Sequence, residues 1–209
     1  TDGHRLANVV YKHFQAEAIE QHLRMIVPTK ALNLLLRNLE KADKVNVQIG
    51  EDHVVFRLDN AIIYSKLISG TYPNYERVLP SDNDKTLRVN RELLISTLRR
   101  VSIFSSSLTN QVRLELSPDE IIIHSEDIEF GAEAKETIPG VFSDEWLQIG
   151  YNSVYLLDIL RHIDTEEVQF DLKDGGSAAI IHPVDQPENE EIVMLLMPIR
   201  ISEEEPRND

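Results

Sequence analysis

The side chains best suited to chemistry form one short run, His124-Ser125-Glu126-Asp127. An imidazole beside two carboxylates could hold a metal ion or act as a general base, which would make the protein a hydrolase. Three isoleucines at 121–123 precede the run, however, and the segment alternates like a β-strand whose exposed face carries polar residues. We therefore interpret the run as a strand surface and keep a hydrolase that uses His124 as an alternative.

A second polar run, Asp82-Asn83-Asp84, superficially resembles a calcium loop. Thr86 and Arg88 stand where such a loop needs an oxygen ligand and a glycine, so a linker is the better interpretation. The sequence also has no Gly-x-Ser-x-Gly, no phosphate-binding glycine-rich loop, no His-Glu-x-x-His and no cysteine. We predict no catalytic residue, no metal and no cofactor, and a protein that is not an enzyme.

Composition limits the class of protein. The 209 residues are 42% hydrophobic, enough for one or two cores, and no apolar run approaches the roughly 20 residues that cross a bilayer. The lack of cysteine fits the cytoplasm. A net charge of −15 argues against a nucleic-acid partner, but residues 1–80 hold 10 Lys and Arg against 9 Asp and Glu, whereas residues 81–209 hold 11 against 27. The acidic character is therefore concentrated downstream.

A Leu/Arg helical pattern occurs three times with a constant spacing of 62 residues. Its members are Leu32, Leu36, Arg37 and Leu39; Leu94, Leu98, Arg99 and Val101; and Leu156, Leu160, Arg161 and Ile163. Each copy begins with a short apolar run, at 25–27, 87–89 and 147–149, and continues into alternating strands, which is typical of a β-α-β-β-β unit. Because one such unit is too small for a core, we expect neighbouring units to pair and one copy to lack a partner.

The strands are predicted to form antiparallel sheets with the helices on a single face. Alternating segments at 45–49, 112–116 and 168–172 are followed by short polar connections typical of hairpins. Residues 81–84 contain no apolar side chain and separate the first copy from the second. They predict an interdomain linker.

The first predicted helix carries a basic stripe. At about 100° per residue, Lys30, Arg37 and Lys41 fall on one side, and the leucines at 32, 35, 36 and 39 fall on the side that should pack on a sheet. The second helix carries Arg99 and Arg100. A single stripe is typical of a solvated helix face, but repetition in equivalent units favours a non-specific surface for phosphates.

Three segments place polar or aromatic residues in an apolar context: residues 2–6, 69–80 and 194–201. Together they supply Leu, Met, Val, Pro and Tyr with arginines, which suits an adaptable apolar pocket with a charged rim for a short peptide. The sequence pattern alone, however, favours the interpretation that residues 195–197 are core and that Pro198 merely ends a strand.

Four motifs occur in a fixed order along the chain: Thr-Asp-Gly-His-Arg-Leu-Ala at 1–7, Gly-Thr-Tyr-Pro-Asn-Tyr-Glu-Arg-Val-Leu-Pro at 70–80, Gly-Tyr-Asn-Ser-Val-Tyr-Leu-Leu-Asp-Ile-Leu at 150–160 and Leu-Met-Pro-Ile-Arg at 196–200. In sequence and order they closely resemble the bacterial DNA polymerase III beta subunit family of sliding clamps. The resemblance implies an α+β DNA clamp fold built from repeated β-α-β-β-β units, with antiparallel sheets outside and helices on the inner face. It implies that 1–80 is the second half of a truncated middle clamp domain and 85–201 the C-terminal domain, with the linker 81–84 between them. Residues 202–209 depart from the family pattern, whose members commonly stop just after the last motif, and we expect them to form a disordered acidic tail.

The resemblance also implies the site residues. The peptide-binding cleft would use Thr1, Gly3, His4, Arg5, Leu6, Pro73, Arg77, Val78, Asn152, Tyr155, Leu195, Leu196, Met197, Pro198, Ile199 and Arg200. Lys30, Arg37, Lys41, Arg99 and Arg100 would face DNA, and Ile103 and Phe104 would lie in a dimer interface.

The function that the resemblance implies is a cytoplasmic replication processivity factor. Such a clamp encircles double-stranded DNA without reading its sequence and tethers the DNA polymerase III alpha subunit, the clamp loader, and other polymerases and repair proteins through their clamp-binding motifs. The full-length chain would form a ring-shaped homodimer, whereas the fragment would be a monomer or would associate in a non-native way through its uncovered strand edge. The alternative from another class is a repeat-built protein-interaction scaffold with no role on DNA.

Overall fold

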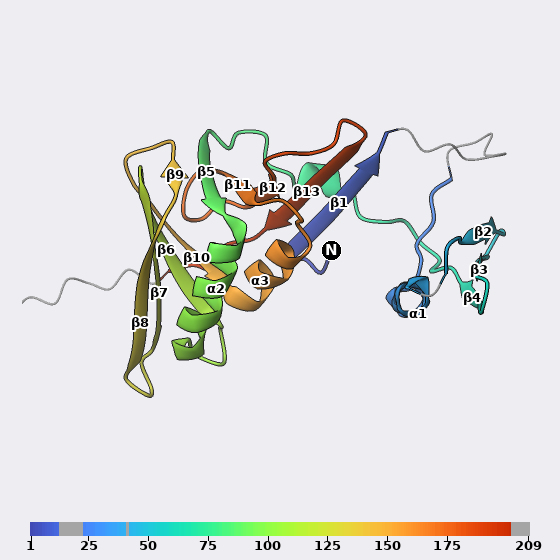
Figure 1. The fold of residues 1–209 in the computed structure, drawn as a ribbon, viewed down its shortest axis with the longest axis horizontal. Helices are drawn as coiled ribbons and strands as arrows, with labels where there is room; N and C mark the ends of the chain where they lie inside the picture. The colour runs from blue at the N-terminus through green and yellow to red at the C-terminus, as the bar shows by residue number, and fades with distance from the viewer. Residues whose placement is uncertain (13–22, 41, 202–209) are drawn as a thin grey trace, which may run out of the picture. The chain divides into compact units, whose positions relative to one another are not determined.

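The computed structural model describes residues 1–12, 23–40 and 42–201. The chain forms two compact units (Figure 1): unit 1 comprises residues 1–14 and 76–209, and unit 2 comprises residues 15–75. Lys41 and the acidic tail expected at 202–209 lie outside the described residues.

Unit 1 contains most of the secondary structure. In chain order its elements are β1 (Arg5–Tyr11), β5 (Lys85–Asn90), α2 (Arg91–Val101), η2 (Ser102–Phe104), β6 (Gln111–Ser117), β7 (Glu120–Asp127), β8 (Ala132–Pro139), β9 (Val141–Phe142), β10 (Leu147–Asn152), α3 (Ser153–Arg161), β11 (Glu167–Leu172), β12 (Ala179–Pro183) and β13 (Glu190–Leu196). The short helix η1 (Tyr75–Arg77) spans the boundary between the units.

Two β-α-β-β-β units follow each other in unit 1, as the repeat predicted: β5-α2-β6-β7-β8 and β10-α3-β11-β12-β13. They exchange their first strands. The four-stranded sheet has the order β10-β6-β7-β8, and the six-stranded sheet has the order β1-β13-β12-β11-β5-β9. Val89 of β5 is opposite Val168 of β11, and Leu147 of β10 is opposite Leu116 of β6, in antiparallel register. The two repeats therefore share one core.

The repeated leucines fill that core. Leu94, Leu98, Leu156 and Leu160 are completely buried between the sheets and the two helices, which lie side by side (Figure 1). Arg99 and Arg161, the arginines of the same pattern, are exposed. A helix with one apolar and one polar face packs in this way on a sheet.

Asparagine caps begin both helices of unit 1. The side-chain oxygen of Asn90 accepts a hydrogen bond from the Leu93 N–H at 2.9 Å, and Asn152 accepts from Val154 and Tyr155 at 2.9 and 3.2 Å. Arg91 then joins the helices, because its guanidinium donates to the carbonyl oxygens of Thr165 and Leu160, at and beyond the end of α3. Such caps satisfy the free N–H groups of a first helical turn.

Unit 2 holds the first copy of the repeat in an incomplete form. Its elements are α1 (Thr29–Leu39), β2 (Asn46–Ile49), β3 (His53–Arg57) and β4 (Ile62–Lys66), with sheet order β2-β3-β4. Residues 25–27, predicted as a strand, have no assigned strand, although the Ile26 carbonyl accepts a hydrogen bond from Ile68 at 2.9 Å. That part of the prediction is wrong, because one backbone bond does not make a ladder.

The apolar face of α1 is only partly covered. Leu35 packs on the small core of Val54, Phe56 and Leu58, but Leu32, Leu36 and Leu39 are exposed. The prediction that all four leucines pack on a sheet is therefore wrong for three of them. Strands of four or five residues in a three-stranded sheet are too small to cover the whole face of an eleven-residue helix.

The segment expected as a linker at 81–84 is anchored on unit 1. The side-chain amide of Asn83 donates to the carbonyl oxygens of Asp171 and Ala178, at 2.8 and 3.2 Å. Asp82 forms an ion pair of 2.6 Å with Lys173. The division between the compact units falls earlier, between Tyr75 and Glu76.

Candidate peptide-binding cleft

The pairing of β1 with β13 brings the first and last sequence motifs together. Arg5 lies opposite Leu196 and Leu6 lies opposite Leu195 in antiparallel register. The Met197 N–H donates to the His4 carbonyl at 2.9 Å and extends the ladder by one step. Leu6 and Leu195 are both buried. Segments at opposite ends of the chain thus form a two-stranded ribbon.

A tight turn precedes β1. The Asp2 carboxylate accepts hydrogen bonds from the N–H groups of His4 and Arg5, at 3.0 and 3.1 Å, and Gly3 adopts φ 87° between them. The Thr1 hydroxyl donates to the Arg5 carbonyl at 2.8 Å. Partial burial works to raise the pKa of Asp2, but the His4 N–H and the Arg5 guanidinium outweigh it and hold that pKa below its ordinary value. The turn fixes where His4 and Arg5 point.

Tyr155 of α3 is the centre of a small aromatic and cationic cluster. The guanidinium carbon of Arg5 lies 4.7 Å from the centroid of its ring, within the range of a cation–π contact. The His4 ring stacks on the same side chain with centroids 6.0 Å apart and an interplanar angle of 22°. Arg5 also forms ion pairs with Asp2, at 3.0 Å, and with Asp158 of α3. The first and third motifs therefore meet here.

Residues 197–200 leave β13 and run along β10. The Ile199 N–H donates to the Gly150 carbonyl at 2.8 Å. Met197, the first residue of this segment, is 43% exposed. A Cβ atom on Gly150 would lie 2.9 Å from the Ile199 carbonyl oxygen and 3.0 Å from Ile201 Cγ1. Glycine at 150 is therefore required by close approach of two backbones.

We expect Gly150→Ala to loosen residues 197–200 without unfolding unit 1. The added methyl group must push the Ile199 carbonyl away, which weakens the hydrogen bond to residue 150. The Ile199 amide should exchange with solvent roughly tenfold faster, measured by hydrogen exchange. Gly176→Ala is the matched control, because its nearest neighbour would be Asp174 Oδ1 at an ordinary 3.6 Å. Equal protection in both variants would contradict the prediction.

The cleft residues predicted from the second motif do not all belong to the same unit. Arg77 ends η1 and Val78 is exposed, both in unit 1, whereas Pro73 belongs to unit 2. The residues that the structure brings together are Thr1, Gly3, His4, Arg5, Leu6, Asn152, Tyr155, Leu195, Leu196, Met197, Pro198, Ile199 and Arg200.

A hollow of about 590 Å³ lies on the α3 side of the β1–β13 ribbon. Of the predicted cleft residues, Thr1, Arg5 and Leu6 line it. The other lining residues are Asp2, Ala7, Val9, Tyr11, Asp158, Ile159, His162, Asp164, Glu190, Ile192 and Met194. Sequence reasoning missed these residues, although the two-residue period from Arg5 through β1 would have found the strand members.

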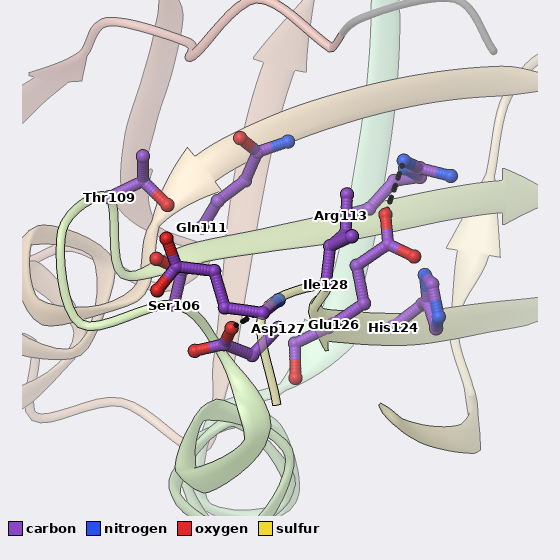
Figure 2. A pocket seen from close by; sticks show the side chains of 10 residues that line it. Ser106, Thr109, Gln111, Arg113, His124, Glu126, Asp127 and Ile128 are labelled. Carbon is purple, nitrogen blue, oxygen red and sulfur yellow. Dashed lines mark hydrogen bonds and ion pairs between the residues drawn. The ribbon is translucent and has the colours of Figure 1, made fainter. Parts of the chain in front are cut away.

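The His124 run lies at the opposite end of unit 1, beside a second hollow of about 290 Å³ (Figure 2). His124 Nε2 is 3.0 Å from Glu133 Oε1, and Arg113 is 3.4 Å from Glu126. Ser125 is buried instead of lying on the strand surface, and its hydroxyl donates to the Val101 carbonyl at 2.5 Å. Its placement corrects the surface interpretation for that residue, because its neighbours on β7 point the other way. The run thus forms cross-strand ion pairs and a structural hydrogen bond.

The residues expected in a dimer interface are accessible in this chain. Ile103 and Phe104, in η2, are 76% and 41% exposed. Strand β8 is the last strand of the four-stranded sheet.

The residues expected to face DNA differ in their surroundings. Lys30, Arg37 and Arg99 are exposed. Arg100 instead forms a bidentate ion pair with Glu136 of β8, with N···O distances of 2.8 and 2.6 Å. The bonds to Arg100 lower the pKa of the Glu136 carboxyl group. Much of the Arg100 charge is therefore cancelled within unit 1.

Within the described part of the chain, the helices are all too short or too polar to cross a membrane. Residues 1–12, 23–40 and 42–201 contain no cluster of three or more His, Asp or Glu side chains arranged to hold a metal ion.

Paired β-α-β-β-β units, with strand exchange and two helices on one face, define a clamp-type α+β domain. The family profile described as DNA polymerase III beta subunit, C-terminal domain, matches residues 76–200, and the profile for the central domain matches residues 1–74. Strand β1, within the central-domain match, pairs here with the last strand of the C-terminal domain.

Curated relatives and solved structures agree with these profiles. A beta sliding clamp of Pseudomonas aeruginosa is 35% identical over 202 residues, which cover 96% of this chain and 53% of the relative. That of Escherichia coli K12 is 32% identical with the same coverage. A crystal structure of the P. aeruginosa clamp has a TM-score of 0.86 at 34% identity, covering 96% of this chain and 54% of that one. A Bartonella birtlesii clamp bound to griselimycin has a TM-score of 0.85 at 33% identity, covering 96% and 53%.

The chain therefore belongs to the DNA polymerase III beta subunit family. It spans about half the length of the curated relatives that it matches.

Proposed function

We propose that this chain serves bacterial DNA replication as part of a sliding clamp, a cytoplasmic processivity factor without catalytic activity. The cleft binds short Gln/Leu/Phe-rich segments of the DNA polymerase III alpha subunit, the clamp loader, other polymerases and repair proteins. The observation that carries the proposal is the β1–β13 pairing, which joins residues from the first and last motifs beside Tyr155. Family membership and this geometry support the same site.

The chemistry of the cleft suits a peptide with apolar and aromatic side chains. Met197 is flexible and half-exposed, and a thioether adapts to irregular apolar surfaces. Tyr155 offers a ring already flanked by His4 and Arg5, so a ligand side chain would meet an ordered wall. Arg77 and Val78 complete this cleft in our proposal. Fixed aromatic residues bind with little loss of side-chain entropy.

The contact with duplex DNA is proposed to be weak and independent of sequence. Lys30, Arg37 and Lys41 of the first helical region, with Arg99 and Arg100 of α2, would face the DNA, and the acidic remainder of the chain would repel it elsewhere. Basic contacts without base readout let a protein slide on DNA. Two full-length copies would close the ring through Ile103, Phe104 and the neighbouring strand β8.

The proposal is tested by titrating a fluorescent Gln/Leu/Phe-rich peptide into the protein and measuring anisotropy. We expect saturable binding in the micromolar range, about −8 kcal/mol, and no binding of a scrambled peptide of the same composition. Circular dichroism checks that the protein is folded. A folded protein that binds both peptides equally, or neither, would contradict the cleft.

We expect Glu136→Gln to increase association with a short DNA duplex by about two- to threefold at low salt. Removal of this carboxylate frees the Arg100 guanidinium, and each additional phosphate contact steepens the dependence on salt. Fluorescence anisotropy at several salt concentrations measures both effects. Glu120→Gln, an exposed change in the β6–β7 hairpin, is the matched control. An identical gain in both variants would reflect net charge alone, and no gain would favour a protein-interaction scaffold without a DNA role.

A further inference from the structure

Asp158 lies outside the cleft residues named so far, yet it contacts one of them directly. Its carboxylate forms an ion pair with Arg5 Nη1, while Asp2 holds Arg5 Nε at 3.0 Å. The same guanidinium lies 4.7 Å from the centre of the Tyr155 ring. Arg5 is therefore held from three sides, by its own turn and by two side chains of α3.

The position of Asp158 follows from the helix. Tyr155 and Asp158 are three residues apart on α3, so their side chains project from neighbouring positions on one face. Arg5 comes from β1 and reaches across to both. One short helical segment thus supplies the ring on which the guanidinium lies and the carboxylate that anchors it.

The side chains of Arg5, Asp2 and Asp158 together carry a net negative charge. One guanidinium faces two carboxylates, so the group carries an excess of one negative charge, and two of the three guanidinium nitrogens are already engaged. Asp164 and Glu190 line the adjoining hollow but form no ion pair with Arg5 in the described part of the chain. An acidic ligand side chain next to Tyr155 would meet a guanidinium that is already paired with two carboxylates, and the surplus negative charge would repel it.

We propose that Asp158 is a positioning residue that sets the charge specificity of the cleft. By anchoring Arg5 over Tyr155 and cancelling its charge, it makes the site prefer a neutral ligand side chain over an acidic one beside the aromatic residue of the peptide. The inference rests on the proposed function and identifies Asp158 as a residue that determines which peptides the cleft prefers.

A purely structural role predicts something different. The side chains of Arg5 and Asp158 are 29% and 45% exposed, and ion pairs this accessible contribute little to stability. Asp158→Asn is therefore expected to fold. If the carboxylate only braced β1 against α3, its loss would weaken every peptide equally. If it sets specificity, the loss changes the ratio of affinities.

The experiment compares two Gln/Leu/Phe-rich peptides that differ only in an Asn or an Asp beside the aromatic residue. The unmodified protein should bind the Asn peptide about five- to tenfold more tightly at low salt, and the ratio should shrink as salt rises. Asp158→Asn should bring the ratio close to one, chiefly because the Asp peptide gains affinity for the released guanidinium.

Two further variants separate the charge from the packing. Asp158→Glu keeps the carboxylate and should restore the preference. Asp164→Asn removes a charge that lines the same hollow but, within the described part of the chain, forms no ion pair with Arg5. It should change the ratio of affinities little. Circular dichroism and thermal unfolding confirm that all variants are folded.

The outcomes distinguish the inference from the proposed function. If the unmodified protein binds neither peptide, the cleft itself fails. If it binds both but Asp158→Asn leaves their ratio unchanged, or weakens both alike, the cleft stands and the role of Asp158 in specificity is overturned.

Discussion

A protein that carries both Tyr155→Ala and Met197→Ala should lose affinity for a Gln/Leu/Phe-rich peptide by about 100-fold. Tyr155 is the ring flanked by His4 and Arg5, and Met197 is the exposed apolar side chain at the end of the ribbon. Truncation of a central aromatic or flexible apolar residue commonly costs about 1–2 kcal/mol of binding free energy, so two together cost close to 3 kcal/mol.

The measurement is the peptide titration by anisotropy, repeated with the double variant. Val141→Ala, an exposed apolar side chain on β9 at the other end of the six-stranded sheet, is the matched control and should bind normally. Met197 is 43% exposed and Tyr155 packs at the margin of the core, so we expect the double variant to fold, which circular dichroism checks. Normal peptide affinity in a folded double variant would rule out the cleft as placed here.

Tyr151→Phe should stabilise unit 1, and the gain should grow above about pH 10. The ring of Tyr151 in β10 is completely buried, and within the described residues its hydroxyl has no hydrogen-bond partner. An unpaired buried polar group costs about 1–3 kcal/mol, so its removal should add roughly 1 kcal/mol to the free energy of unfolding at neutral pH.

The pH dependence follows from the same burial. Burial raises the pKa of the Tyr151 phenol above its ordinary value of 10. The folded state therefore keeps a proton that the unfolded state releases above pH 10, and stability falls as the pH rises further. Each additional unit should widen the gap between the two proteins by up to about 1.4 kcal/mol. Below pH 10 the Tyr151 phenol keeps its proton in both the folded and the unfolded state, so its ionisation does not change the free energy of unfolding with pH.

Urea unfolding between pH 7 and 11.5 tests the prediction, followed by circular dichroism and by Trp146, the single tryptophan, which lies in unit 1. Tyr64→Phe is the control, because that side chain is 68% exposed. A difference between Tyr151→Phe and the unmodified protein that stays constant with pH would show that the buried phenol does not couple to alkaline unfolding.

The sequence predicted the repeated core because the signal is local. Leu94, Leu98, Leu156 and Leu160 are placed by helical periodicity alone, which identifies the face that must be buried. Periodicity does not identify the partner of a strand, so the exchange of β5 and β10 between the repeats could not be predicted. The exposed leucines of α1 had the same pattern as the buried ones, and what differs is the size of the sheet beneath them.

The site residues likewise include some that the sequence could identify and some that it could not. Residues such as His4 and Met197 came from the resemblance of whole motifs, whereas spacing alone favoured a core role for residues 195–197. Asp158 was missed because a single carboxylate on an amphipathic helix is usually a solvated residue. Its relation to Arg5 depends on a contact between residues 153 positions apart, which no local pattern records.

The exchanged strands have a consequence for synthesis of the chain. Strand β5, at residues 85–90, pairs over its whole length only with β11, at residues 167–172. It therefore lacks this partner until β11 has left the ribosome. At 5–20 residues per second, β5 waits roughly 4 to 16 seconds with Leu87 and Val89 uncovered on that side. Neither repeat completes its sheet alone, so a ribosome that stalls before residue 167 would hold a nascent chain with an open strand edge, a target for chaperones or proteases.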